Sequence, residues 1–192
     1  MPANSPTVEA FSLSHVGILD GTTGAQINDL FGVREASLEV DTDSFDNTGD
    51  NTVLSTWNWF NFATLSVKSG FIGFDTYALL SGNTLTTSGS GAAMSVSAPL
   101  WNESSLNTPT RPVLVRMPSK DSTGAIRTLD IILYKCQFGS ISLDGPQYKD
   151  GLVVSYTAKA VMSSTDEKGV ALPDRAIGRL ISSPGQTPSA AR

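Results

Sequence analysis

The segment VREASLEVDTDSFDNTGDNTVLSTWNWFNFATLSVK, residues 33–68, decides the fold. Its second part, residues 53–68, alternates between two sets of side chains, as a strand with two different faces does. One face of this predicted strand carries Trp57, Trp59, Asn61, Ala63, Leu65 and Val67. The first part, residues 33–43, has apolar residues among polar ones, and the turn formers DSFDNTGDN of residues 43–51 separate the two parts. The segment therefore predicts a long β-hairpin with a flexible, acidic tip.

This predicted hairpin is too long to be buried within its own domain. Strands of globular proteins usually have about five or six residues, and residues 53–68 are a much longer run. A hairpin that outgrows its domain must be covered elsewhere, most simply by neighbouring copies of the same chain. We therefore expect the chain to assemble with itself.

The rest of the chain predicts more strands and one short helix. Residues 74–81 have helical spacing, with Asp75 in the first turn and Gly82 as the C-terminal stop. Residues 86–93 (TTSGSGAA) predict a flexible loop. Further strands are expected at residues 11–20, 93–98, 112–117, 125–138 and 151–162, with reversals at residues 119–124 and 143–151. In the last of these strands one face carries Leu152, Val154, Tyr156, Ala158, Ala160 and Met162.

These elements predict a mainly β fold, an antiparallel β-sandwich or barrel with one short α-helix and the long hairpin. We expect residues 1–10 to be an N-terminal arm, residues 11–170 to be one β domain, and residues 171–192 to be a partly flexible C-terminal extension.

Composition and charge exclude several classes of function. Of the 192 residues only 16% are charged, and the formal net charge is −5. Eleven of the thirteen basic residues follow position 110, and none lies between Arg34 and Lys68, so the basic stripe of a nucleic-acid-binding protein is not expected. No apolar run is long enough to span a bilayer, and the N-terminus does not resemble a secretory signal. The single cysteine, Cys136, indicates synthesis in a reducing compartment.

The sequence offers little support for catalysis, a cofactor or a metal. A catalytic triad or a Cys–His pair would have to use His15, the only histidine, and we expect His15 and Cys136 to be structural. Residues 41–46 begin like an EF-hand loop, but Phe45 replaces a ligand and Asp46 stands where glycine is needed. A solvated, like-charged loop is preferred to a calcium site. We expect no enzyme activity, no cofactor and no metal.

Four aromatic residues of the hairpin have two interpretations. Trp57, Trp59, Phe60 and Phe62 could form a stacking platform for sugars or bases. No lysine or arginine lies among them, which disfavours nucleic-acid stacking. Packing in the core or in a subunit interface is the preferred interpretation.

The order of long hairpin, short helix and β-rich second half resembles the major tail tube proteins of long flexible-tailed (siphovirus-type) bacteriophages. The segments SGFIGFDTYALLSGNTLT (69–86) and YKCQF … LDGPQYKDGLVVSYTAKA (134–160) carry the resemblance. It implies hexameric rings that stack into a tube, with strands of adjacent subunits joined in one barrel around the channel. It also implies a virion protein assembled in the bacterial cytoplasm. The implied partners are other copies of the chain, the tape-measure protein, tail chaperones, and the tail terminator and distal tail proteins. DNA would pass without specific binding, and no membrane is involved.

Charge suggests roles for the hairpin residues in such a tube. An acidic lumen repels DNA phosphates and lets the genome slide, whereas a basic lumen would hold it. We predict that Glu35, Glu39, Asp41 and Asp43 face the lumen, because alternation places them on one side. Residues of the tip are predicted to meet the next ring: Asp46, Asn47, Gly49 and Asp50.

Other classes of protein remain as alternatives. The nearest are further virion β proteins, namely a tail terminator, a decoration protein or a baseplate component. A carbohydrate-binding β-sandwich that uses the tryptophans and a hydrolase that uses His15 or a carboxylate pair have less support in the sequence.

Overall fold

A computed structural model of the chain describes residues 8–10, 15–30, 32–49, 52–70, 73–98, 108–147 and 151–184. Its helices are α1 (Phe74–Ser81) and the 3-10 turn η1 (Gly91–Ala93). Its strands are β1 (Val8–Ala10), β2 (His15–Leu19), β3 (Gln26–Asp29), β4 (Val33–Gly49), β5 (Thr52–Ser69), β6 (Thr86–Ser88), β7 (Ser95–Ser97), β8 (Thr110–Asp121), β9 (Ile126–Gln147), β10 (Gly151–Ala160), β11 (Ser163–Thr165), β12 (Ala171–Ala176) and β13 (Gly178–Pro184). The predicted mainly β fold with antiparallel pairing is confirmed.

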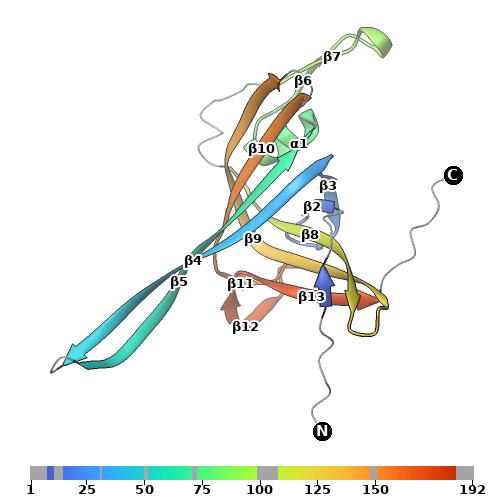
Figure 1. Ribbon diagram of the computed structural model, residues 1–192. Helices are drawn as coiled ribbons and strands as arrows, with labels where there is room; N and C mark the ends of the chain where they lie inside the picture. The colour runs from blue at the N-terminus through green and yellow to red at the C-terminus, as the bar shows by residue number, and fades with distance from the viewer. Residues whose placement is uncertain are drawn as a thin grey trace.

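One large sheet organises the molecule, in the order β3-β2-β8-β9-β10-β5-β4 (Figure 1). Strand β1 is added on β8 and β13 on β9. The long strand β9 divides the sheet, because it pairs with β8 up to Gln137 and with β10 from Cys136 onward. We call β4, β5, β10 and residues 136–147 the hairpin half. The body half comprises β2, β3, β8, β13 and residues 126–137.

The main core lies between these two halves. It combines Val16, Ile18, Val113, Val115 and Leu133 of the body half with Ala63, Leu65, Val67, Val154, Tyr156, Ala158 and Ala160 of the hairpin half. Leu80 of α1 packs into the same cluster. The face predicted for the last long strand is confirmed from Val154 to Ala160; Met162 follows the end of β10 and is 36% exposed, and the side chain of Leu152 lies outside the described residues.

The body half is covered on both faces, unlike the hairpin half. Leu19, Leu114, Ile132 and Tyr134 form a second buried cluster, against which Leu172, Ala176 and Ile181 pack. Strands β12 and β13, which come after residue 170, supply these covering residues. The second face of the hairpin half has no such cover among the described residues.

The predicted helix is confirmed at residues 74–81. Gly82 ends it in the left-handed conformation with φ 71°, where a residue with a side chain would be strained. Tyr77 and Leu80 turn into the protein, while Phe74 is exposed. The flexible loop predicted at residues 86–93 is wrong, because β6, η1 and β7 form a small hairpin there. Its polar, glycine-rich sequence is typical of loops, yet the 3-10 turn brings its two ends into register.

The long hairpin is also confirmed, and its two strands are paired over a longer stretch than predicted. Pairing of β4 with β5 runs from Val33 opposite Ser69 to Gly49 opposite Thr52. The flexible tip predicted over residues 43–51 is therefore wrong for residues 43–49, which belong to β4. Strand β10 pairs with β5 only as far as Ala63, which lies opposite Ala160. Residues 52–62 of β5 therefore project beyond the rest of the sheet. At about 3.3 Å per residue the projection extends roughly 35 Å.

Candidate functional site

The two faces of the hairpin half have opposite character. Residues that pair across its four strands form rows, and three rows on the core face are entirely apolar: Ala36–Val67–Tyr156–Ile141, Leu38–Leu65–Ala158–Phe138 and Val40–Ala63–Ala160–Cys136. The rows between them are polar: Glu35–Lys68–Ser155–Ser142, Ser37–Ser66–Thr157 and Glu39–Thr64–Lys159–Gln137. The hairpin half thus has a broad surface of hydroxyl, amide and charged groups that no apolar cluster of described residues covers, and we call it the polar face.

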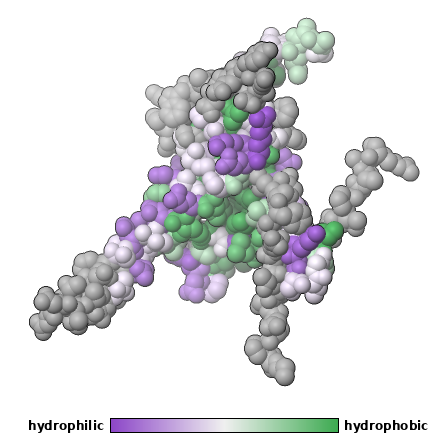
Figure 2. Space-filling model, in the orientation of Figure 1, coloured by the Kyte–Doolittle hydropathy of each residue, from purple (hydrophilic) through white to green (hydrophobic). Residues whose placement is uncertain are grey.

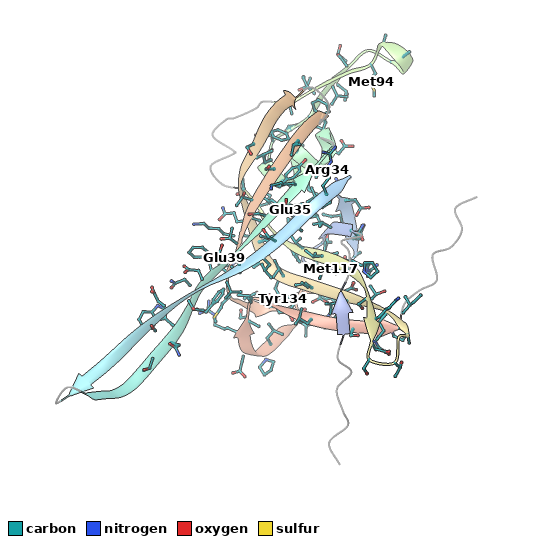
Figure 3. The ribbon with its side chains drawn as sticks, viewed as in Figure 1. Arg34, Glu35, Glu39, Met94, Met117 and Tyr134 are labelled. Atoms are coloured by element: carbon teal, nitrogen blue, oxygen red, sulfur yellow. The ribbon has the colours of Figure 1, made fainter. Side chains whose placement is uncertain are left out.

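The four acids predicted to act together lie on this polar face. Glu35 and Glu39 follow one another along β4 (Figure 3). The carboxylate of Glu35 lies 2.8 Å from the ammonium of Lys68, whereas Glu39 has no ion pair with a described residue. Asn61 donates from Nδ2 to Asp41 Oδ2 at 3.3 Å and to Asp43 Oδ2 at 3.2 Å. All four are exposed, so the edge strand β4 presents a column of acids.

Trp59 and Phe60 lie on the opposite faces of β5 from those that regular alternation predicts. Asp41 pairs with Phe62 and Thr42 pairs with Phe60, which leaves Asn61 as the extra residue of a β-bulge. Alternation is reversed beyond it, so Phe60 packs against the core while Trp59 lies on the polar face, 48% exposed. The prediction that Trp59 shares a face with Ala63 is therefore wrong. Phe62 lies on the polar face, where the ammonium of Lys159 is 4.5 Å from its ring centroid.

The rest of the predicted tip and interface is described only in part. Asp46, Asn47 and Gly49 pair with Thr56, Ser55 and Thr52 as members of β4. The side chains of Asp46, Asn47 and Trp57 lie outside the described residues, as does Asp50 altogether.

Two strand edges of the hairpin half lack a strand partner within the described part of the chain. One is the outer edge of β4, the last strand of the sheet. The other belongs to β9 beyond Gln137, where β8 begins and its pairing with β9 stops. The edges lie on opposite sides of a four-stranded ribbon, and β4 and β9 run in opposite directions because three antiparallel pairings separate them. Exposed edges of this kind are templates for another strand.

Apolar side chains are incompletely covered at the β4 edge. Leu38 is 37% exposed and Val40 is 49% exposed, although their partners Leu65 and Ala63 are buried. A small groove of about 90 Å³ lies beside them, lined by Ala36, Ser37, Leu38, Leu65, Val115, Met117, Ile131 and Leu133. Figure 2 shows hydrophobic residues at the surface between the base of the hairpin and the body. Such a patch at a free edge is typical of a protein–protein contact.

The residues considered for catalysis are held in structural surroundings. His15 Nε2 lies 3.0 Å from Gln26 Oε1 and 3.0 Å from Asp29 Oδ1, on the short strands β2 and β3. Cys136 is fully buried, and burial raises the pKa of its thiol to about 12, which keeps it protonated. Within the described ranges no three His, Cys, Asp or Glu side chains are grouped as metal ligands would be.

Three features of this surface were missed in the sequence. The bulge at Asn61 has no signature in a single sequence, because asparagine also fits a regular edge position. The free edge of β9 depends on where β8 begins. Lys135 and Arg175 line a common pocket although 40 residues separate them in the chain. Only the fold brings such distant residues together.

None of the described helices has the length and apolar character needed to cross a membrane. Comparison of the chain with protein-family models and with curated proteins found no match.

Proposed function

We propose that this protein is the structural subunit of a phage tail tube, in which rings of copies stack into a hollow conduit for DNA. The observation that carries the proposal is the hairpin half: a four-stranded antiparallel ribbon with one polar face, one apolar face and two edges that have no strand partner among the described residues. A ribbon of this kind is completed by other copies of itself.

The direction of the strands supports closure into a ring. When copies are arranged head to tail, the β4 edge of one meets the β9 edge of the next. Because β4 and β9 run in opposite directions, this joint is antiparallel, like every other pairing in the sheet. Six copies, the number that resemblance to tail tube proteins implies, would give a barrel of roughly 24 strands, well above the size at which barrels enclose an aqueous channel. Closure also removes the exposed edges.

The apolar face supports the same joint. Leu38 and Val40 at one edge and Ile141 at the other are the ends of apolar rows that continue through the core. A strand paired with β4 places its side chains about 5 Å from those of β4. The core rows would then continue across the joint, which buries the exposed parts of Leu38 and Val40.

The polar face would line the channel. No apolar cluster of described residues covers it, and β4 contributes exposed carboxylates to it, Glu39 among them. DNA phosphates are repelled by such a wall, so the genome passes without specific binding. The roughly 35 Å projection of the hairpin would reach the adjacent ring, where the tip residues Asp46, Asn47, Gly49 and Asp50 make contact.

The proposed setting is the virion, after assembly in the bacterial cytoplasm. During growth the lumen would hold a tape-measure protein, and tail chaperones would keep unassembled copies apart. A tail terminator and distal tail proteins would close the two ends. These partners are the ones that the resemblance to tail tube proteins implies.

Electron microscopy of the purified protein over a range of concentrations tests the proposal. We expect stacked rings or tubes, and the Trp59→Asp variant should not stack, because Trp59 is an exposed aromatic of the projecting hairpin. Discrete particles at every concentration would contradict a tube and favour a terminator, decoration or baseplate protein.

The lumen assignment has its own test in assembled tails. A Glu35→Lys, Glu39→Lys variant reverses two charges on the polar face, so DNA should leave the tube more slowly. Ejection at the normal rate from intact tails would show that these residues do not face the channel.

A further inference from the structure

A polar pocket beside the free edge of β9 contains two cations that form no ion pair with a described residue. It has a volume of about 300 Å³, and Lys135, Arg175, Thr110, Tyr134, Ser164 and Asp166 are among its lining residues. Lys135 and Arg175 are exposed, and neither forms an ion pair with a described residue. The lining acid, Asp166, is already engaged, because its Oδ1 accepts the N–H groups of Lys168 and Val170 at 2.9 Å each. The pocket therefore has an excess of positive charge available to a ligand.

The position of the pocket relates it to the neighbouring copy. It is lined by Thr110 and Pro112 at the start of β8, and Thr110 pairs with Gln137 at the point where the edge of β9 becomes free. The pocket thus lies where the edge that the proposed joint uses comes to its end.

The strand pairing shows how far along the hairpin the acids of β4 and the pocket lie. Val40, Ala63, Ala160 and Cys136 form one row across the hairpin half. Asp41 and Asp43 lie beyond Val40 toward the hairpin tip, and Lys135 lies beyond Cys136 in the same direction. Asp41 and Asp43 lie on the polar face, because alternation along β4 separates them from Val40. Lys135 is exposed beside the buried Cys136, so its side chain is also directed away from the core.

From these positions we infer that the pocket of Lys135 and Arg175 receives Asp41 and Asp43 of a second copy of the chain. The inference rests on the proposed edge-to-edge joint. Two copies side by side at the same height place β4 up to Leu38 along the free edge of β9 from Phe138 onward, and they place Asp41 and Asp43 next to the start of β8, where the cationic pocket lies. The contact orients neighbouring copies head to tail in the ring, because each copy has acids at one edge and cations at the other. Complementary charges favour the correct pairing and disfavour the acid-to-acid approach.

A charge-exchange experiment tests the contact. Variant A carries Asp41→Lys and Asp43→Lys, and variant B carries Lys135→Glu and Arg175→Glu. Alone, each variant places like charges at every joint, so the concentration needed to form rings should rise on the order of tenfold or more. An equimolar mixture of A and B restores opposite charges at each A–B joint and should assemble as the wild type does. The variant with all four substitutions keeps the net charge of −5 and should assemble alone.

Circular dichroism and thermal melting provide the folding control, since all four positions are exposed. Lys168→Glu reverses an exposed charge outside the pocket lining and should leave assembly unchanged. If the wild type forms rings and A or B assembles alone as readily, the contact is refuted while the tube proposal stands. If A and B each fail and their mixture also fails, the contact is refuted as well. If the wild type forms no rings at any concentration, the proposed function fails and the contact fails with it.

Discussion

The substitution Val40→Asp should weaken the assembly of the protein while leaving the fold of a single copy intact. Val40 points to the core side of β4, but the side chain is 49% exposed, because β4 is the edge strand and nothing among the described residues lies beyond it. An aspartate there can keep its carboxylate in water within an isolated copy. In the proposed joint the same carboxylate would be enclosed between β4 and the neighbour, at the level where the free edge of β9 ends and β8 begins.

The cost can be worked out from the exposed fraction. Full burial of a valine side chain stabilises by about 1.5–3 kcal/mol, so the exposed half of Val40 represents about 1 kcal/mol per joint. Enclosing an unpaired carboxylate adds a few kcal/mol more. A total of about 3 kcal/mol corresponds to roughly a hundredfold weaker association at each joint. The free energy of unfolding of the separate copy should change by well under 1 kcal/mol, as at other exposed positions.

Light scattering against protein concentration measures assembly, and urea unfolding of the separate copy measures stability. Ser37→Asp is the matched control, because it adds the same charge to the same strand but on the polar face. We expect Ser37→Asp to assemble and Val40→Asp to remain as separate copies. Assembly of Val40→Asp at wild-type concentrations would show that the apolar edge of β4 is not enclosed by a neighbour.

Two further predictions concern the single copy. In Gly178→Ala the new Cβ would lie 2.1 Å from the carbonyl oxygen of Ile132, so β13 should separate from β9 and thermal stability should fall; about 1–3 kcal/mol is the usual cost of such overpacking. Gly139→Ala is the control, since its Cβ meets nothing within 4 Å, and equal melting temperatures for the two variants would contradict the clash. The pKa of Asp121 is lowered, first by the hydroxyl of Thr123 and then by backbone N–H groups of its turn. A lowered pKa in the folded state means that this stabilisation is complete above the ordinary aspartate value and is lost as pH falls through the folded value. The melting temperature should therefore fall when the pH is lowered below about 4. If Asp121→Asn loses as much melting temperature over this pH range as the wild type, the turn at Asp121 is not the cause.

Sequence patterns predicted those parts of the fold that local physics determines. Helix α1 was predicted residue for residue, because Gly82 is an unambiguous stop and the apolar spacing is helical. The hairpin was predicted because alternation over so many residues fits only a strand. The four acids were correctly placed on one face, since β4 alternates without interruption from Glu35 to Asp43.

The errors arose where tertiary pairing overrides local preference. Residues 43–49 are rich in turn formers, yet each can pair with a partner once β5 lies alongside, so the ladder continues. The pocket of Lys135 and Arg175 combines β9 with β12 and was invisible for the same reason. In both cases the deciding contacts join residues far apart in the chain, which a local pattern does not record.

The bulge at Asn61 gives the hairpin a change of orientation that a regular ladder would lack. Because side chains alternate with a period of two, one additional residue in β5 turns the outer part of that strand over relative to its inner part. A regular ladder that kept Asn61 paired would direct Trp59 inward and Phe60 outward with the same sequence at the tip. A single insertion therefore allows the base of the arm to seal a core while its far end offers an indole to whatever lies beyond the molecule.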